Sequence, residues 1–208
     1  MSYSIVGIAN LALQRIGAKS RITSLTDGSP NAINVNAVWE YILDEVLEFV
    51  KPKFATERVV LAQGTTDPAN TDVYEFEYPI PSDYLCLAVD TKDDPAVWPA
   101  SVVPYVIETL SAGTVCLMTN YDSTDTDDVY LTYIKRVSDP AKFAPSFINA
   151  LVFRLAAELT FAVAPSGSKF EAMMTLYERA ARRARGASRG QDYLEDEQGS
   201  DSWETAGR

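Results

Sequence analysis

The spacing of apolar residues changes twice along this chain, and those changes limit the folds that it can adopt. Apolar residues recur at helical spacing in residues 1–55. From 56 to 138 they form short runs rich in β-branched and aromatic side chains, and from 139 to 188 the helical spacing returns. We therefore predict an α+β protein in which an antiparallel β domain is inserted into a bundle of about four helices.

The first two predicted helices carry clear start and stop signals. Residues 5–16 repeat apolar side chains at helical spacing, and Gly17 stands where such a helix would end. Ser29 followed by Pro30 is a serine cap with proline at the first helical position. This pair predicts a second helix that runs to about Val50, with an apolar face wide enough for burial on two sides.

The last two predicted helices are separated by a short break. The third begins at Pro145, and the sequence Pro-Ser-Gly at 165–167 interrupts it. Ser168 and Glu171 have the spacing of a capping box, in which each side chain bonds an exposed amide at a helix start. The fourth helix is therefore predicted to begin there and to fade at Gly186.

Six short segments in the middle of the chain have strand character. Glycine, proline, aspartate and asparagine separate them, which is typical of an antiparallel sheet or a small sandwich. The predicted strands are 58–61, 74–78, 84–89, 105–110, 114–118 and 129–134.

Composition excludes several classes of chemistry. The 208 residues carry a net charge of −11, with no histidine and two cysteines, Cys86 and Cys116. Structural zinc needs four Cys or His ligands, and this chain has two cysteines and no histidine. We expect neither a metal site nor a cofactor. Without histidine, a serine nucleophile lacks its usual base, and no GxxxxGK[ST] segment is present. These two observations argue against a serine hydrolase and against an NTP-driven motor. We expect no enzyme activity, while the two cysteines are either free thiols or one disulfide.

Two aspartate-rich segments are candidate acidic sites: Asp90, Asp93 and Asp94, and Asp122, Asp125, Asp127 and Asp128. A calcium loop counted from Asp122 needs glycine at its sixth place and glutamate at its twelfth, where this chain has Asp127 and Tyr133. The first segment has the carboxylates that glycoside hydrolysis uses, but it lies in a turn before Pro95. A solvated loop is the expected structure of both.

The sequence also predicts where the protein is made. The first five residues, Met-Ser-Tyr-Ser-Ile, lack the basic and apolar regions of a signal peptide. No uninterrupted apolar run approaches the ~20 residues of a membrane span, so no membrane association is expected. We predict synthesis in a cytoplasm, from which a partner recruits the protein.

Seven short segments carry a resemblance through their order and spacing. They are IANLAL at 8–13 with IGA at 16–18, ITSL at 22–25, DEVL at 44–47, YPIPSDYL at 78–85, YIKRVSDP at 133–140, and ALVFRLAAEL at 150–159. Together they resemble the tail tubular protein A family, the head-to-tail adaptors of short-tailed bacteriophages. The resemblance covers about residues 3–188.

The resemblance implies a structural role in a virion. Members of the family assemble as a twelve-subunit ring between the portal protein and the tail nozzle, which is formed by a tail tubular protein B-like partner. Their helical part tends to face the portal, and DNA leaves through the central hole without sequence-specific binding. The implied location is the head–tail junction of the virion, after a stay in the host cytoplasm.

An arginine-rich segment near the predicted end of the last helix is the first candidate binding site: Arg179, Arg182, Arg183, Arg185 and Arg189. It is either a solvated helix end, where cations favour the helix dipole, or a docking surface for the portal or a neighbouring subunit. Nucleic-acid binding is a third interpretation, weakened by the acidic residues nearby.

The acidic tail, 189–208, is the second candidate site. Its large apolar residues stand in an otherwise polar segment: Tyr193, Leu194 and Trp203. Such residues often anchor a segment that folds on binding, so we predict that this extended tail orders against the portal or an adjacent subunit. Plain disorder is the alternative.

The sequence is also compatible with two other functions. A tail-associated polysaccharide-degrading enzyme would need two carboxylates that converge in a cleft. A soluble interaction protein unrelated to virions would need neither a cleft nor a portal. Co-sedimentation with a portal separates both from an adaptor, because only the adaptor requires binding there.

Overall fold

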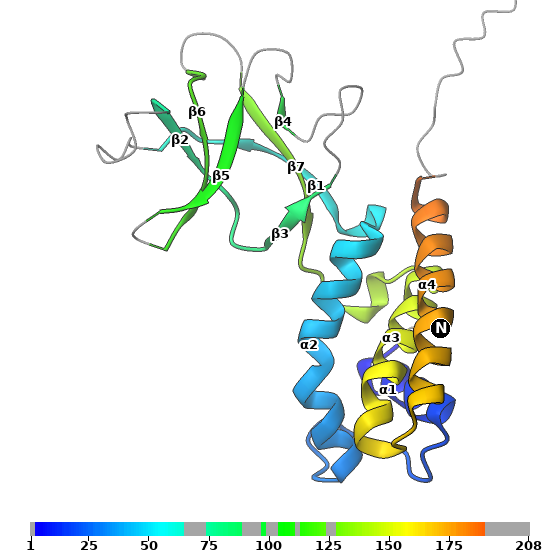
Figure 1. Cartoon of the computed structure of the whole chain (residues 1–208). Coiled ribbons are helices and arrows are strands. Elements are labelled where there is room, and N and C mark those ends of the chain that lie inside the picture. Colours follow the sequence, from blue (N-terminus) through cyan, green and yellow to red (C-terminus); the bar gives the residue numbers. More distant parts are fainter. Residues whose placement is uncertain are drawn as a thin grey trace, which may run out of the picture.

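The computed structural model describes residues 3–64, 74–88, 97–98, 104–110, 113–123 and 128–189. Within these residues, four α-helices form a bundle and short antiparallel strands form a separate β unit (Figure 1). Both ends of the described chain contribute to the bundle, and the β unit comes from the middle of the sequence. The predicted α+β class is confirmed.

Helix α1 (Ile5–Ile16) has the bounds that the sequence predicted. At its start, the Ser4 hydroxyl accepts a hydrogen bond from the Gly7 amide at 3.0 Å. At its end, Gly17 adopts a φ of 80°, a left-handed conformation that glycine enters without steric cost.

Helix α2 (Pro30–Val50) also begins at its predicted cap. The Ser29 hydroxyl accepts a hydrogen bond from the Ala32 amide at 3.2 Å. The helix ends where Lys51 takes a left-handed φ of 50°, one residue before a proline that cannot continue the helix.

Helix α3 (Pro145–Val163) is the central helix of the bundle and contacts the other three. It is long and apolar enough, by length and composition only, to cross a membrane. However, 56% of the residues in that apolar stretch are buried inside the protein, and Arg154 and Glu158 interrupt it. Packing against three neighbouring helices accounts for its apolar character.

Helix α4 (Gly167–Arg189) starts before the predicted capping box. The Ser166 hydroxyl accepts the Lys169 amide at 3.4 Å, so Ser166 occupies the capping position and Ser168 lies inside the first turn. The predicted box at Ser168 was therefore wrong by two residues, because two serines offered alternative caps. The helix also continues past Gly186, since tertiary packing of α4 on α3 outweighs the weak helix propensity of glycine.

The β unit contains two antiparallel sheets. In the first sheet β7 pairs with β1, β3 and β4, and the second sheet has the order β2-β6-β5. The strands are β1 (Thr56–Leu61), β2 (Phe76–Pro79), β3 (Tyr84–Leu87), β4 (Val97–Trp98), β5 (Tyr105–Thr109), β6 (Val115–Thr119) and β7 (Val129–Lys135).

Six strands overlap the six predicted segments, but their details differ. β3 is shorter than predicted and ends at Leu87, and its register with β7 shifts between Tyr84 and Cys86. β4 was not predicted, because two residues, Val97 and Trp98, are too few to show a period. Short turns of 3-10 helix, Lys53–Ala55 and Pro140–Lys142, connect the β unit to the bundle.

Contacts at the junction fix the β unit against the bundle. The Lys51 ammonium, at the end of α2, donates a hydrogen bond to the Leu87 carbonyl of β3 at 2.6 Å. Arg136, just after β7, forms an ion pair with Asp44 of α2. Ala88 and Ile134, although they lie in and beside strands, belong to the buried core of the bundle.

Candidate interaction surfaces

The arginine-rich segment lies on the solvent side of α4. Arg179, Arg182 and Arg183 are exposed, and Arg185 is half-buried. Arg182 lies 3.5 Å from Glu178, one turn earlier, a contact between two exposed groups that contributes little. Three arginines are therefore presented to solvent over little more than one helical turn. The side chain of Arg189 and the tail residues Tyr193, Leu194 and Trp203 lie outside the described residues.

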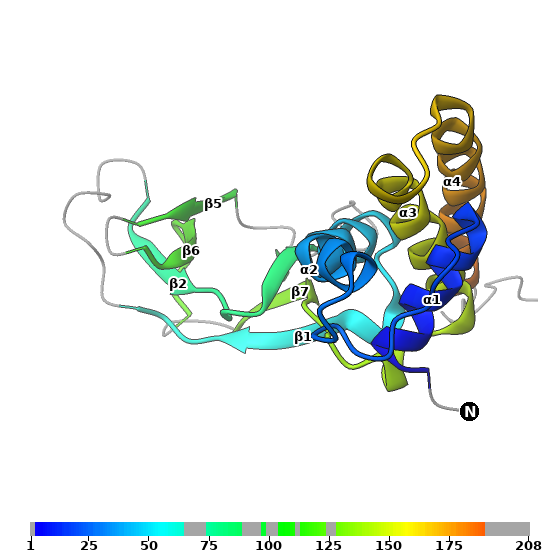
Figure 2. The same ribbon diagram turned by 90° about the horizontal axis from the view of Figure 1, so that it is seen from below.

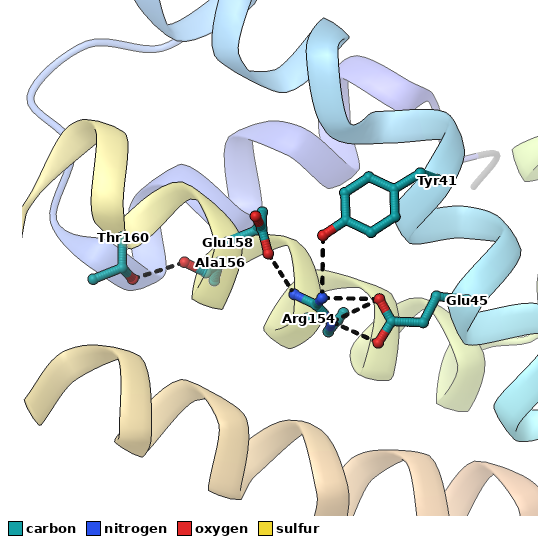
Figure 3. A network of polar contacts seen from close by, with 6 residues as sticks. All are labelled: Tyr41, Glu45, Arg154, Ala156, Glu158 and Thr160. Atoms are coloured by element: carbon teal, nitrogen blue, oxygen red, sulfur yellow. Dashed lines mark hydrogen bonds and ion pairs between the residues drawn. The ribbon is translucent and has the colours of Figure 1, made fainter. Parts of the chain in front are cut away.

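A buried arginine that sequence reasoning missed holds α2 to α3 (Figure 3). The side chain of Arg154 on α3 is 11% exposed and lies 2.8 Å from a carboxylate oxygen of Glu45 on α2. A second carboxylate, that of Glu158, lies 2.9 Å away one turn further along α3. The Tyr41 hydroxyl accepts a third hydrogen bond from the guanidinium at 3.2 Å.

The electrostatics of this network keep the arginine charged. Burial opposes the charge of Arg154, but the hydrogen bonds that it donates to Glu45 and Glu158 outweigh burial and raise the pKa of Arg154 above its usual range. Burial also raises the pKa of Tyr41, and burial together with the charge of Glu45 raises the pKa of Tyr177 to about 12. The network therefore positions two helices around a guanidinium that stays charged.

The sequence did contain one signal for this network. Arg154 is the only basic residue in the apolar third helix, and Glu158 follows it at i+4. A single cation in an apolar helix face, with a carboxylate one turn away, favours a buried ion pair. The partner from α2 could not be predicted, because the distance between Glu45 and Arg154 in the sequence carries no information on their contact.

The outer face of α2 combines acidic and large apolar side chains. Glu40 and Glu48 are exposed, while Asp44 and Glu45 are half-buried and engaged by arginines within the subunit. Ile33 is 60% exposed on this face, and Tyr41, which bonds Arg154, is 48% exposed at its edge. Phe49 is 45% exposed, but it faces α4, where its ring lies 6.1 Å from that of Tyr177. An exposed large apolar side chain such as Ile33 beside exposed carboxylates is typical of an interaction surface.

These two surfaces belong to different helices of the bundle. In the ribbon views α2 and α4 lie to either side of α3 (Figures 1 and 2), and α2 also contacts α4, where the Phe49 and Tyr177 rings lie 6.1 Å apart. The side formed by α2 is acidic and partly apolar, and the side formed by α4 carries the exposed arginines. The bundle therefore has faces of opposite charge.

Two hollows flank the bundle. The larger, of about 520 Å³, lies between α2 and the start of α1, and Glu40, Asp44, Trp39 and Arg136 contribute to its wall. The smaller, of about 90 Å³, lies beside the end of α4 between Lys53, Lys142 and Ser188. There the Ser188 hydroxyl accepts a hydrogen bond from the Lys53 amide at 2.8 Å.

The remaining sequence candidates add no chemistry to the described part of the chain. Asp90, Asp93, Asp94, Asp125 and Asp127 lie outside it, and the described residues contain no cluster of three potential metal ligands.

The cysteines are the last candidates. Cys86 and Cys116 are free thiols on strands of different sheets, so of the two alternatives the structure has free thiols and not the disulfide. Burial raises the pKa of both thiols, which lowers their reactivity as thiolates.

A scan against protein-family models and a search of curated proteins both found no match to this chain. Among the described residues the structure offers charged and apolar surfaces on a rigid frame, which suits binding to other macromolecules.

Proposed function

We propose that this chain is a structural head-to-tail adaptor of a bacteriophage virion, in which copies form a ring between the portal and the tail nozzle. The observation that carries the proposal is the fixed junction between the bundle and the β unit. An adaptor must hold one part against the portal and another against the nozzle, so the angle between the two parts has to be constant.

The contacts at the junction meet this requirement. Lys51 bonds a β3 carbonyl, Arg136 pairs with Asp44, and Ile134 of β7 is fully buried in the core of the bundle. These contacts come from a hydrogen bond, an ion pair and apolar packing, so relative rotation of the two parts would break several interactions together. The order of the family-like segments supports the same function.

The family resemblance suggests how the partners are divided between the two parts. In the proposed ring the bundle faces the portal and the β unit faces the nozzle, with twelve copies as the resemblance implies. The net charge of −11 would repel the phosphates of DNA in the central hole, so that DNA slides past without sequence-specific contacts. The proposed location is the head–tail junction of the virion.

The enzyme alternative has one observation in its favour, the larger hollow with Glu40 and Asp44 in its wall. Glycosidases place two carboxylates on either side of the scissile bond. Here both carboxylates come from adjacent turns of one helix, and Arg136 already engages Asp44. This arrangement fits a structural contact better than it fits an acid–base pair.

Co-sedimentation of the purified chain with portal rings of its own virus tests the proposal. We expect the chain to pellet with the portal at a fixed ratio and to remain in the supernatant alone. No enrichment in the portal pellet, over a range of salt concentrations, would contradict the adaptor function. Hydrolysis of host surface glycans in the same preparation would support the enzyme instead.

A further inference from the structure

We infer that α2 of one copy packs against the arginine face of α4 in the next copy, so that these two helices form the contact between subunits. The inference rests on the proposed ring and names its interface. It commits the arginines to a second copy of this chain as their partner, one of the two partners that the sequence left open.

The α2 face has the composition of an interface with a missing partner. Ile33 is 60% exposed on the side of α2 that carries Glu40 and Glu48, which is costly for a large apolar side chain. Tyr41 is 48% exposed at the edge of this side, although its hydroxyl also accepts a hydrogen bond from Arg154. Glu40 and Glu48 are exposed along the same helix. Large apolar side chains with charged groups around them are typical of the centre and rim of a protein interface.

The α4 face is complementary in charge and in side-chain size. Its exposed arginines, Arg179, Arg182 and Arg183, oppose the sign of the α2 carboxylates. The other exposed positions of α4 include small residues that leave room for large side chains of a neighbour: Ala172, Thr175, Gly186 and Ala187. Large residues that meet small ones allow two helices to pack closely.

The charges also lie at matching heights. α2 and α4 both begin at the lower end of the bundle in Figure 1. At 1.5 Å per residue, Glu40 and Glu48 lie about 15 and 27 Å from the start of α2, and Arg179 and Arg183 lie about 18 and 24 Å from the start of α4. Copies related by rotation about an axis parallel to the bundle would therefore bring the two charged stretches side by side.

The placement of the faces determines the type of assembly. Because the outer faces of α2 and α4 are different surfaces of the subunit, the contact joins two different surfaces and leaves one of each free on every dimer (Figure 2). Such a heterologous contact continues from copy to copy and closes into a ring when the rotation allows it. A two-fold symmetric dimer would instead use the same surface twice.

A charge-swap experiment tests this contact with the full chain. One variant carries Glu40→Lys with Glu48→Lys, and the other carries Arg179→Glu with Arg183→Glu. In the first variant both faces are basic, and in the second both are acidic, so each should self-associate about tenfold more weakly than the original chain. In a one-to-one mixture a reversed face always meets an opposite charge, and the two variants should associate alternately.

Sedimentation velocity over a concentration series measures these associations. We expect weak self-association of the original chain that decreases in ~1 M salt, where screening acts over about 3 Å. We expect the mixture to recover the original association to within about threefold. Lys19→Glu with Arg21→Glu, in the exposed loop after α1, makes the same charge change as the second variant and should leave association unchanged.

Each outcome decides the question. Recovery in the mixture supports the contact and shows that both variants are folded. No association of the original chain at any concentration overturns it, as does a mixture that associates no better than its components. Portal co-sedimentation is measured separately, so a chain that binds the portal but fails the charge swap would refute the interface and retain the adaptor function.

Discussion

The bundle buries one continuous apolar core that all four helices share, whereas the buried side chains of the β unit form a smaller cluster between two short sheets. The bundle core also includes residues from the β segments, among them Ala88 and Ile134. The β unit is therefore supported by the bundle at its base. The bundle therefore supplies most of the stability of the protein, because burial of apolar area is the main stabilising term.

The largest expected effect comes from truncating one fully buried leucine in each region. Leu155→Ala in α3 and Leu131→Ala in β7 both remove a side chain with 0% exposure and leave a cavity. We expect each to lower the free energy of unfolding of its region by about 3 kcal/mol.

Thermal unfolding separates the two leucine variants when it is followed by circular dichroism in the far UV, which reports the helices, and in the near UV, which reports the tyrosines. Leu155→Ala should lower the helical transition by several degrees, while Leu131→Ala should mainly affect near-UV signals from the tyrosines of the β unit. Equal loss of helical signal in both variants would show that bundle and β unit unfold as one unit.

Removal of Arg154 is the next largest change and probes the bundle alone. Arg154→Ala leaves the carboxylates of Glu45 and Glu158 next to each other without their cation and removes the packing of the arginine stem. We expect the free energy of unfolding, measured with urea, to fall by about 2–3 kcal/mol. This is less than the cost of breaking a fully buried ion pair, because both carboxylates are partly exposed. Arg154→Met with Glu45→Gln and Glu158→Gln, which removes all three charges, should recover more than half of that loss.

A hydroxyl in the β unit gives a smaller effect confined to that region. The Tyr78 side chain is fully buried, and its hydroxyl donates to the Tyr121 carbonyl at 2.7 Å and accepts the Ser123 amide at 3.0 Å. Tyr78→Phe removes both hydrogen bonds and leaves the Tyr121 carbonyl and the Ser123 amide without them. The free energy of unfolding should fall by about 1–2 kcal/mol. Hydrogen exchange of amides in β2 and β6 should accelerate, with no change in α3; an equal increase in the bundle would contradict the separation of the two regions.

The smallest expected effect is a pH dependence of the bundle at high pH. The Tyr177 pKa is raised to about 12, so the neutral phenol is favoured in the folded state. The neutral phenol therefore contributes stability that is fully present below the unfolded pKa of about 10 and is lost as the pH rises through 12. By pH 11 the free energy of unfolding should have fallen by roughly 1 kcal/mol through this group. Urea unfolding between pH 8 and 11 should show a smaller decrease for Tyr177→Phe, and equal slopes for both proteins would contradict the assignment.

The helices were predictable because their signals are local. Gly17 and Ser29 determine a helix end and a helix start through contacts with residues a few positions away, and the structure retains both. The capping box at Ser168 failed for the same local reason, since Ser166 competes for the same amides of α4. Strand boundaries were less predictable, because β4 exists only through its pairing with β7.

By itself, the sequence determined the fold class, the exclusion of histidine-based chemistry and the presence of an arginine-rich last helix. Only the tertiary structure decided that Glu45 and Arg154 meet, and that the exposed carboxylates of α2 and the exposed arginines of α4 form two separate surfaces. The physical reason is range. Helix caps and periods act over a few residues, whereas charge pairing and surface placement depend on how α3 packs between α2 and α4, which no local pattern encodes.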